Sequence, residues 1–136
     1  MAYSPDVNVL LDGKRHLIVR ANAISDGTIG SAIIVDKSAY MGPEGITGIE
    51  PTKLVVEEIW YSIQGYEAIT LYWDHGASDT VIGSYSGDGY VDYRPYGGLT
   101  DDGTTGTGDI IFSYSGGSTD MSGDTFSITL KLRKKQ

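Results

Sequence analysis

The segment DTFSITLKLR, residues 124–133, decides the fold class because its apolar and polar residues alternate without interruption. Successive side chains of a β-strand point to opposite faces, so this pattern predicts a strand with one buried and one solvated face. Such strands are typical of antiparallel sheets. The inward face is formed by Phe126, Ile128, Leu130 and Leu132, and the outward face by Ser127, Thr129, Lys131 and Arg133.

Further short strand signals, separated by glycine-containing turns, occupy most of the chain. Asp12-Gly13 suits a two-residue type I′ hairpin, in which both central residues have positive φ, and Asp88-Gly89 is a second turn signal. Another hairpin is expected around Gly65. The expected strands span residues 7–11, 16–24, 30–35, 53–64, 67–73, 80–86, 89–94, 109–115 and 124–133.

The segment KLVVEEIWYSIQ, residues 53–64, changes the parity of its apolar residues midway. Val56 belongs to one parity and Ile59 to the other. The switch at Glu57-Glu58 predicts a β-bulge, which inserts one residue and re-aims the alternation. A helix over the same segment is the competing interpretation, but the Val, Ile, Trp and Tyr content favours a strand.

These signals predict an all-β fold: a single antiparallel β-sandwich or jelly-roll-like barrel of about eight to nine short strands, with little or no helix. The length of 136 residues fits one domain, residues 1–136. Residues 36–52 contain three glycines and two prolines without a sustained period, and are expected to form an extended arm or loop. The basic residues within 131–136 are expected to form a C-terminal tail.

Composition restricts the chemistry and the partners. The chain has no cysteine, which excludes thiolate metal sites, disulfides and cysteine nucleophiles. Its net charge of −8 opposes binding to phosphate backbones, so nucleic acid is not expected as the main partner. No apolar run approaches the ~20 residues that cross a bilayer, and the first residues lack the pattern of a secretory signal. No membrane partner is expected.

Catalytic motifs are not found in the sequence. His16 lies inside a predicted strand and His75 in a loop, and the sequence GSYSG at 83–87 has tyrosine where a nucleophile elbow needs serine. There is no P-loop and no dinucleotide-binding fingerprint. We therefore expect no catalytic residue and no cofactor, and predict that the protein is not an enzyme.

Two clusters leave an alternative open. Asp101, Asp102 and Asp109 offer the hard oxygen ligands that Ca²⁺ prefers, but EF-hand spacing is absent and a solvated acidic loop is the other interpretation. The second cluster consists of tyrosines, which suit either a recognition surface or cross-strand packing. Its members are Tyr85, Tyr90, Tyr93, Tyr96 and Tyr114.

Three segments together resemble a family of small virion proteins of tailed bacteriophages: YEAITLYWD at 66–74, GYVDYRPYGGLTDDGTTGTGDIIFS at 89–113 and FSITLKLRKKQ at 126–136. The similarity spans most of the chain and rests on packing and turn residues. It implies a head decoration, or cement, protein: a β-rich homotrimer that binds the outer surface of the major capsid protein shell. The protein is then made in the host cytoplasm and located on the capsid exterior of the virion.

Two other functions fit the same pattern of residues. One is a structural protein of the phage tail or adaptor, and the other is a carbohydrate-binding or adhesin module that uses the tyrosines. For a decoration protein, the arm 36–52, the N-terminus and the basic tail are the segments expected to reach neighbours. The candidate partner-binding residues are Tyr40, Met41, Pro43, Ile46, Tyr93, Arg94, Tyr96, Lys134 and Lys135.

Overall fold

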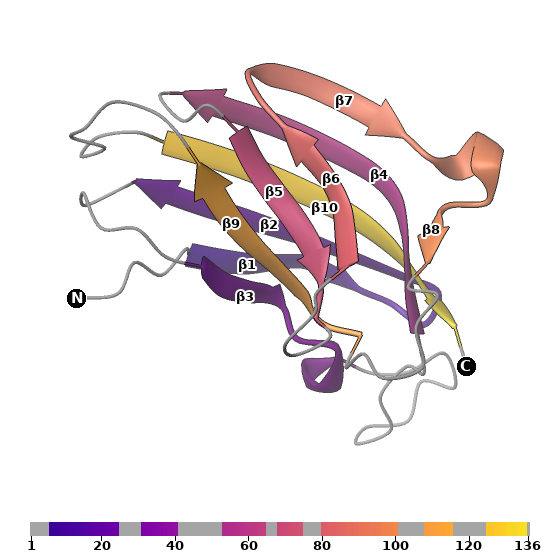
Figure 1. The fold of residues 1–136 in the computed structure, drawn as a ribbon. Helices are drawn as coiled ribbons and strands as arrows, with labels where there is room; N and C mark the ends of the chain where they lie inside the picture. Colours follow the sequence, from indigo (N-terminus) through magenta and orange to yellow (C-terminus); the bar gives the residue numbers. More distant parts are fainter. Residues whose placement is uncertain are drawn as a thin grey trace.

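Two antiparallel β-sheets stack face to face in the computed structural model of the protein (Figure 1). Within the described residues the secondary structure consists of ten strands and two 3-10 turns, η1 (Lys37–Ala39) and η2 (Arg94–Tyr96). The expected all-β fold is confirmed, and of the two expected architectures the structure has the β-sandwich. The structure describes residues 6–24, 31–40, 53–64, 68–74, 80–100, 108–115 and 125–135.

The larger sheet has six strands in the order β1-β2-β10-β4-β7, with β8 paired to β4. The C-terminal strand β10 lies at its centre and pairs with β2 on one side and β4 on the other. The strand bounds are β1 (Asp6–Asp12), β2 (His16–Ile24), β4 (Lys53–Gln64), β7 (Asp88–Asp92), β8 (Leu99–Thr100) and β10 (Thr125–Lys135).

The smaller sheet has four strands in the order β3-β9-β5-β6. All of its pairings are antiparallel, and β3 and β6 form its two edges. The strand bounds are β3 (Ser31–Val35), β5 (Ala68–Trp73), β6 (Thr80–Tyr85) and β9 (Ile110–Ser115).

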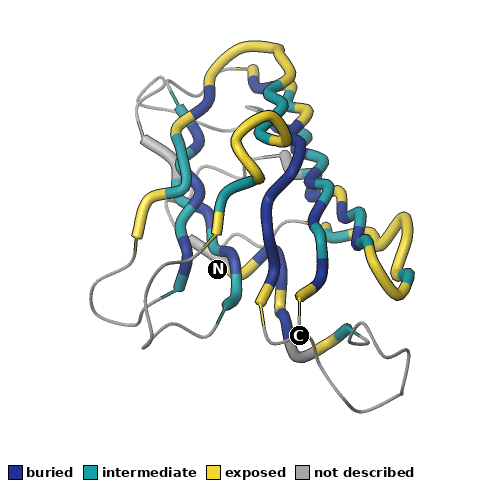
Figure 2. Tube along the Cα trace, turned by 90° about the vertical axis from the view of Figure 1, so that its right-hand side faces the viewer, coloured by how far each residue is buried: buried dark blue, intermediate teal, exposed yellow. Residues whose placement is uncertain are grey.

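The core lies between the two sheets. Alternate positions of β10 are buried, as the sequence of residues 124–133 predicts. Phe126 of β10 meets Phe112 of β9 across the interface, with ring centroids 5.1 Å apart. Tyr61 of β4 meets Tyr85 of β6 in the same way, at 5.2 Å. Figure 2 shows buried positions along the strands and exposed positions at the described turns.

The expected hairpin around Gly65 is wrong. Strand β4 belongs to the six-stranded sheet, whereas β5 belongs to the four-stranded sheet, so the two consecutive strands do not pair. Both have an apolar face to bury, and placing them on opposite sides of the core buries both faces against each other. Local alternation does not distinguish a hairpin from such a crossing, because a strand has the same period in either sheet.

The two expected turns are displaced along the chain. Strands β1 and β2 do form a hairpin, but Gly13 N–H donates to His16 O at 2.9 Å, which centres the turn on Lys14-Arg15. No described non-glycine residue has positive φ, and Gly13 is not among the positive-φ glycines, so the type I′ assignment to Asp12-Gly13 is wrong. Asp88 lies inside β7, and Gly87, with φ of 67°, precedes that strand.

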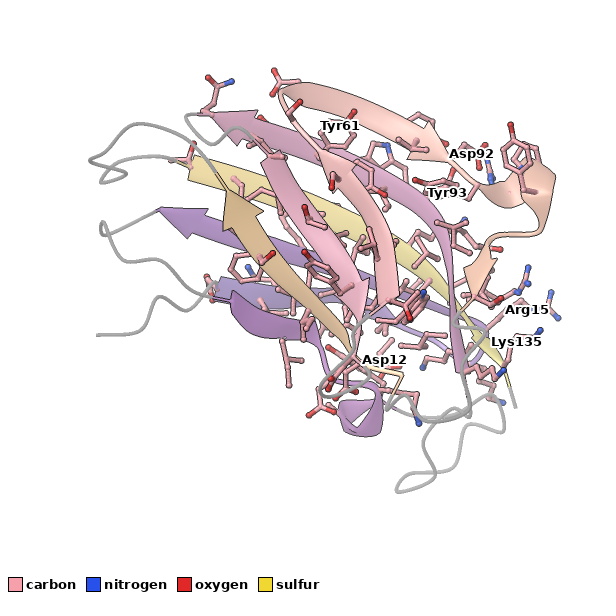
Figure 3. All side chains as sticks on the ribbon, in the orientation of Figure 1. Asp12, Arg15, Tyr61, Asp92, Tyr93 and Lys135 are labelled. Carbon is pink, nitrogen blue, oxygen red and sulfur yellow. The ribbon has the colours of Figure 1, made fainter. Side chains whose placement is uncertain are left out.

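The expected basic tail is part of β10. The strand continues to Lys135, and Lys134 takes the next inward position after Leu132. The Lys134 side chain is completely buried and forms an ion pair with Asp12 at the end of β1. Its backbone N–H also donates to Arg15 O at 2.8 Å. Arg15 and Lys135 lie at the same end of the sandwich in Figure 3. Residues 131–135 are therefore a paired strand end, because β10 has β2 and β4 as neighbours there.

The expected arm, residues 36–52, is described over 36–40. There the chain makes the 3-10 turn η1, and the backbone N–H of Lys37 donates to the Asp109 carboxylate at 2.9 Å. Tyr40 is half-buried against the core. The remainder of the arm lies outside the described residues. In the part of the chain with assigned structure, no helix has the length and apolar character to cross a membrane.

Candidate functional site

The outer face of the six-stranded sheet carries a network of ion pairs and hydrogen bonds between side chains of neighbouring strands. It originates at a bulge in β4, where Lys131 pairs with Glu58 but Leu132 pairs with Val56, leaving Glu57 as the extra residue. The bulge predicted at Glu57-Glu58 is confirmed. Both glutamates are buried, and each has partners on neighbouring strands.

Glu57 joins three strands of the six-stranded sheet. Its carboxylate lies 3.2 Å from His16 Nε2 of β2 and 3.2 Å from Arg133 Nη1 of β10. Its carbonyl oxygen accepts a hydrogen bond from the backbone N–H of Tyr93 at 2.8 Å. A buried carboxylate is costly unless it is paired, and these contacts supply that pairing.

Glu58 connects β4 to β7 and β10. Its carboxylate lies 3.0 Å from Arg94 Nη2 and 3.5 Å from Lys131 Nζ. It also accepts a hydrogen bond of 2.6 Å from the hydroxyl of Tyr90, and this bond is the main cause that raises the pKa of Tyr90. Positive and negative side chains alternate on this face, so their charges offset one another. The contacts of Glu58 with Tyr90 and Arg94 hold the β7–η2 segment against the sheet.

Asp92 and Arg94 form a compact ion pair next to Glu58. The guanidinium group donates to both carboxylate oxygens of Asp92 at 2.9 Å, and the backbone N–H of Arg94 donates to one of them. These hydrogen bonds lower the pKa of Asp92 below 3.8 and raise the pKa of Arg94. Arg94 is thus held in one orientation at the end of β7, where Asp92 and Tyr93 lie together in Figure 3.

Beyond this network, strand registers align the outward side chains into rows. Trp60 of β4 lies beside Tyr90 of β7, and the two rings stack with centroids 5.2 Å apart and planes 30° apart. The side chains on either side are short and polar. One row is Arg20, Thr129, Trp60 and Tyr90, and the next is Asn22, Ser127, Ser62 and Asp88.

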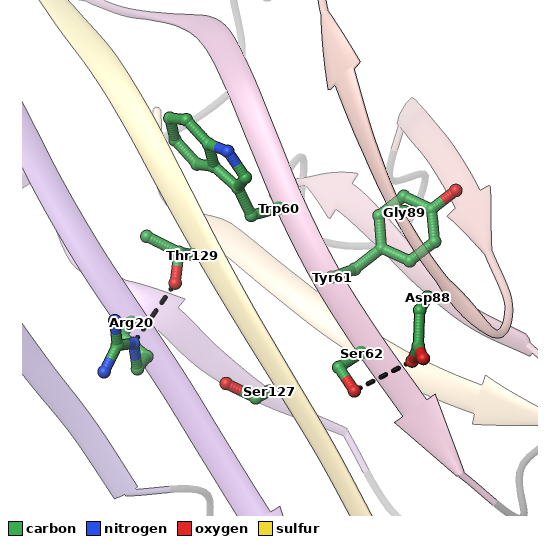
Figure 4. A pocket seen from close by; sticks show the side chains of 8 residues that line it. All are labelled: Arg20, Trp60, Tyr61, Ser62, Asp88, Gly89, Ser127 and Thr129. Atoms are coloured by element: carbon green, nitrogen blue, oxygen red, sulfur yellow. Dashed lines mark hydrogen bonds between the residues drawn. The ribbon is translucent and has the colours of Figure 1, made fainter.

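An open groove with a volume of about 380 Å³ follows these rows (Figure 4). Two hydrogen bonds order its polar groups: Arg20 Nε donates to Thr129 Oγ1 at 3.2 Å, and Ser62 Oγ donates to Asp88 Oδ1 at 2.8 Å. The lining residues are Arg20, Trp60, Tyr61, Ser62, Asp88, Gly89, Ser127 and Thr129. Trp60 was not among the candidate residues predicted from the sequence. Its outward orientation follows from the alternation after the bulge, because the preceding residue, Ile59, faces inward.

A second surface feature is apolar and lies at the edge of the same sheet. Val9, Leu10 and Leu11 of β1 are 50, 49 and 46 % exposed. Strand β1 pairs only with β2 in the described sheet and contains a bulge between Val9 and Leu11. Three consecutive exposed apolar residues on an edge strand are typical of a surface that contacts another protein.

The tyrosine cluster divides into packing and surface residues. Tyr85 is buried, and its hydroxyl is 2.9 Å from the hydroxyl of the half-buried Tyr93. Tyr90 is exposed beside Trp60, and Tyr96 in η2 is 82 % exposed. The packing interpretation therefore applies to Tyr85, whereas recognition by the exposed Tyr90 and Tyr96 stays a prediction. The side chain of Tyr114 lies outside the described residues.

The candidate partner-binding residues occupy different environments. Arg94, Tyr96 and Lys135 are exposed, whereas Tyr40 and Tyr93 are half-buried. Lys134 was expected at the surface, but its side chain is buried against Asp12 and is therefore unavailable to a partner. The alternation along β10 already indicates an inward side chain at position 134. Met41, Pro43 and Ile46 lie outside the described residues.

The candidate calcium ligands are only partly described. The carboxylate of Asp109 accepts the hydrogen bond from Lys37, and its carbonyl oxygen accepts one from the backbone N–H of Asp74 at 3.0 Å. Asp109 thus connects β9 to η1 and to the end of β5. Asp101 and Asp102 lie outside the described residues. Within the described ranges, no three acidic or histidine side chains gather as metal ligands would.

Alkaline pH is expected to destabilise the fold through Tyr85. Burial, and then its hydrogen bond with Tyr93, raise the pKa of Tyr85 above the ordinary value of 10.0. The unfolded chain therefore releases this proton first, and stability is lost as pH rises above 10, by up to about 1.4 kcal/mol per pH unit. Tyr85→Phe is expected to flatten this dependence in urea unfolding between pH 9 and 11.

Tyr96→Phe is the matched control, because that side chain is largely exposed. The variant should follow the pH dependence of the original chain. An equally steep alkaline loss in Tyr85→Phe would contradict the assignment to Tyr85. At neutral pH, Tyr85→Phe is expected to lower the free energy of unfolding by about 1 kcal/mol, the contribution of one hydrogen bond.

A scan against protein-family models and a search of curated proteins each return no match for this chain.

Proposed function

We propose that this protein is a bacteriophage capsid decoration protein that binds the outer surface of the major capsid protein shell and stabilises the mature head. The phage assignment rests on the sequence resemblance described above. The observation that supports a binding role is the exposed apolar edge strand β1, with Val9, Leu10 and Leu11 about half exposed. Its residues and its backbone are both suited to contact with another chain.

The edge of a sheet offers unpaired backbone N–H and C=O groups to an incoming strand. In β1 these groups accompany apolar side chains, so a partner strand gains both main-chain hydrogen bonds and apolar burial. The bulge between Val9 and Leu11 interrupts a regular edge, which limits indiscriminate pairing. This combination favours a defined partner, either a capsid subunit or another copy of the chain in a homotrimer.

Stabilisation of a shell requires only preferential binding to one of its states. A protein that binds the mature shell and not its precursors stabilises the mature state by mass action. Several weak contacts made by one trimer gain from effective concentration. The net charge of −8 keeps the decorated particle soluble by mutual repulsion.

Location in the virion is the direct test. Purified virions are separated into heads and tails, the protein is identified by mass spectrometry, and the heads are imaged by electron cryomicroscopy. Density for a β-sandwich on the outside of the shell is the expected result. Absence from the virion, or presence only in the tail, would overturn the decoration proposal, and the tail result would favour the alternative structural role.

Substitution on β1 tests how binding occurs. The double variant Val9→Thr/Leu11→Thr places β-branched, strand-forming threonines at both positions but removes exposed apolar groups. Affinity for heads that lack the protein is expected to fall about tenfold or more, which corresponds to loss of one good apolar contact. Thermal unfolding should change little, because both side chains are already half exposed.

Val81→Thr provides the matched control. Val81 is an exposed valine on β6, the edge of the opposite sheet. Binding of this variant to heads should equal that of the original chain. Equal loss in both variants would indicate a general effect of surface apolarity and would contradict a specific role for β1.

A further inference from the structure

We propose that the groove on the outer face of the six-stranded sheet is a binding site for neutral glycans, with Trp60 as its stacking platform. This activity is separate from capsid binding, because the groove is lined by residues of β2, β10, β4 and β7, whereas the apolar edge lies on β1. A decoration protein with such a site would bring glycans to the surface of the particle.

The aromatic pair supplies the first requirement of a sugar site. Trp60 and Tyr90 are 40 and 48 % exposed, although Trp side chains are usually buried. One face of a pyranose ring presents C–H groups, which carry a slight positive charge. These groups pack on the negative face of an aromatic ring. The stacking of the two rings at 5.2 Å covers part of the Trp60 ring and holds it in place, while the side chain stays 40 % exposed.

The polar groups around the platform supply the second requirement. Arg20 donates hydrogen bonds, Asp88 accepts them, and the hydroxyls of Ser62, Ser127 and Thr129 can do both. Sugar hydroxyls are also donors and acceptors, so they match this mixture. Arg20 and Asp88 lie on opposite sides of β10 and β4, and each is held by a hydrogen bond to a neighbouring hydroxyl. Figure 4 shows both hydrogen-bonded pairs together with the Trp60 side chain.

The size and charge of the groove select the class of glycan. The groove is open and has a volume of about 380 Å³, so a short oligosaccharide could lie along it with one face against the sheet. One arginine and one aspartate leave the lining without net charge, and the whole chain has a charge of −8. An acidic sugar would be repelled by this field. A protein partner would require a larger apolar centre than one Trp–Tyr pair.

The test begins with the intact protein on a printed array of neutral and acidic oligosaccharides. Hits are then titrated in solution by tryptophan fluorescence, which is informative because Trp60 is exposed and Trp73 is buried. A neutral glycan that stacks on Trp60 should shift its emission to shorter wavelength. Binding of neutral oligosaccharides, saturating at micromolar to millimolar concentration, is the expected result.

Three variants locate the site. Trp60→Thr keeps a strand-forming residue and is expected to weaken binding about tenfold or more, measured by calorimetry. Asp88→Asn preserves the side-chain shape and Arg20→Gln gives a shorter polar side chain. Each removes a charged hydrogen-bonding group, and both should weaken the same binding. These two keep the test valid if Trp60→Thr fails to fold. Val81→Thr, at an exposed residue of β6 outside the groove, should bind as the original chain does.

Three results would overturn the glycan site. They are no binding of any neutral oligosaccharide at millimolar concentration, binding of acidic glycans only, and equal binding by the groove variants and the original chain. Binding to isolated heads is measured in parallel. If the original chain binds neutral glycans but does not bind heads, only the decoration proposal is contradicted. If it binds heads but no neutral glycan, only the glycan site is contradicted.

Discussion

Asp12→Ala is expected to lower the free energy of unfolding by about 3 kcal/mol, because it leaves the buried ammonium group of Lys134 without its counter-charge. The Lys134 side chain is completely buried, whereas the Asp12 side chain is 31 % exposed. Loss of one partner from a buried ion pair costs about 3 to 5 kcal/mol, and the partial exposure of Asp12 places this case at the lower end. Equilibrium unfolding in urea measures the change.

Lys134→Met is the informative comparison. Methionine fills much of the same space without a charge, and the remaining carboxylate of Asp12 can be solvated. This variant is expected to change stability by less than about 1 kcal/mol, since apolar replacement of a buried ion pair is often neutral. The double variant Asp12→Ala/Lys134→Met should recover most of the stability lost in Asp12→Ala. Additive losses in the double variant would contradict the proposed asymmetry.

Gly98→Ala is expected to destabilise the fold by about 2 to 3 kcal/mol through strain at the η2–β8 junction. Gly98 has φ of +87°, a conformation that alanine adopts only at a cost of about 1 to 2 kcal/mol. A Cβ atom at this position would also collide with Val55 Cγ1 and approach Val56 O to 3.1 Å. Val55 is fully buried, and Val56 O is backbone, so neither neighbour yields easily.

Gly97→Ala separates the two causes. Gly97 has nearly the same backbone conformation, with φ of +82°, but a Cβ atom there would meet nothing within 4 Å. This variant should therefore lose only the conformational contribution, about 1 kcal/mol. Thermal unfolding of both variants gives the comparison. Equal losses at Gly97 and Gly98 would show that contact with Val55 and Val56 does not limit this junction.

The sequence by itself determined the features that depend on neighbours along the chain. Alternation over residues 124–133 specified a strand with one buried face, because side chains repeat every two residues wherever the strand lies. The parity switch at Glu57-Glu58 specified a bulge for the same reason. With the other strand signals, these patterns were sufficient for an all-β fold, and the choice between a sandwich and a barrel was left open.

Only the tertiary structure decided which sheet each strand joins and which side chains meet. Strands β4 and β5 follow one another but belong to opposite sheets, since both bury an apolar face against the same core. The groove brings Arg20, Trp60, Asp88 and Thr129 together from four strands that are distant in sequence. Lys134 changes from an apparent tail residue to a buried partner of Asp12 because β10 ends beside the first hairpin. Such contacts depend on register between distant strands, which local periodicity does not encode.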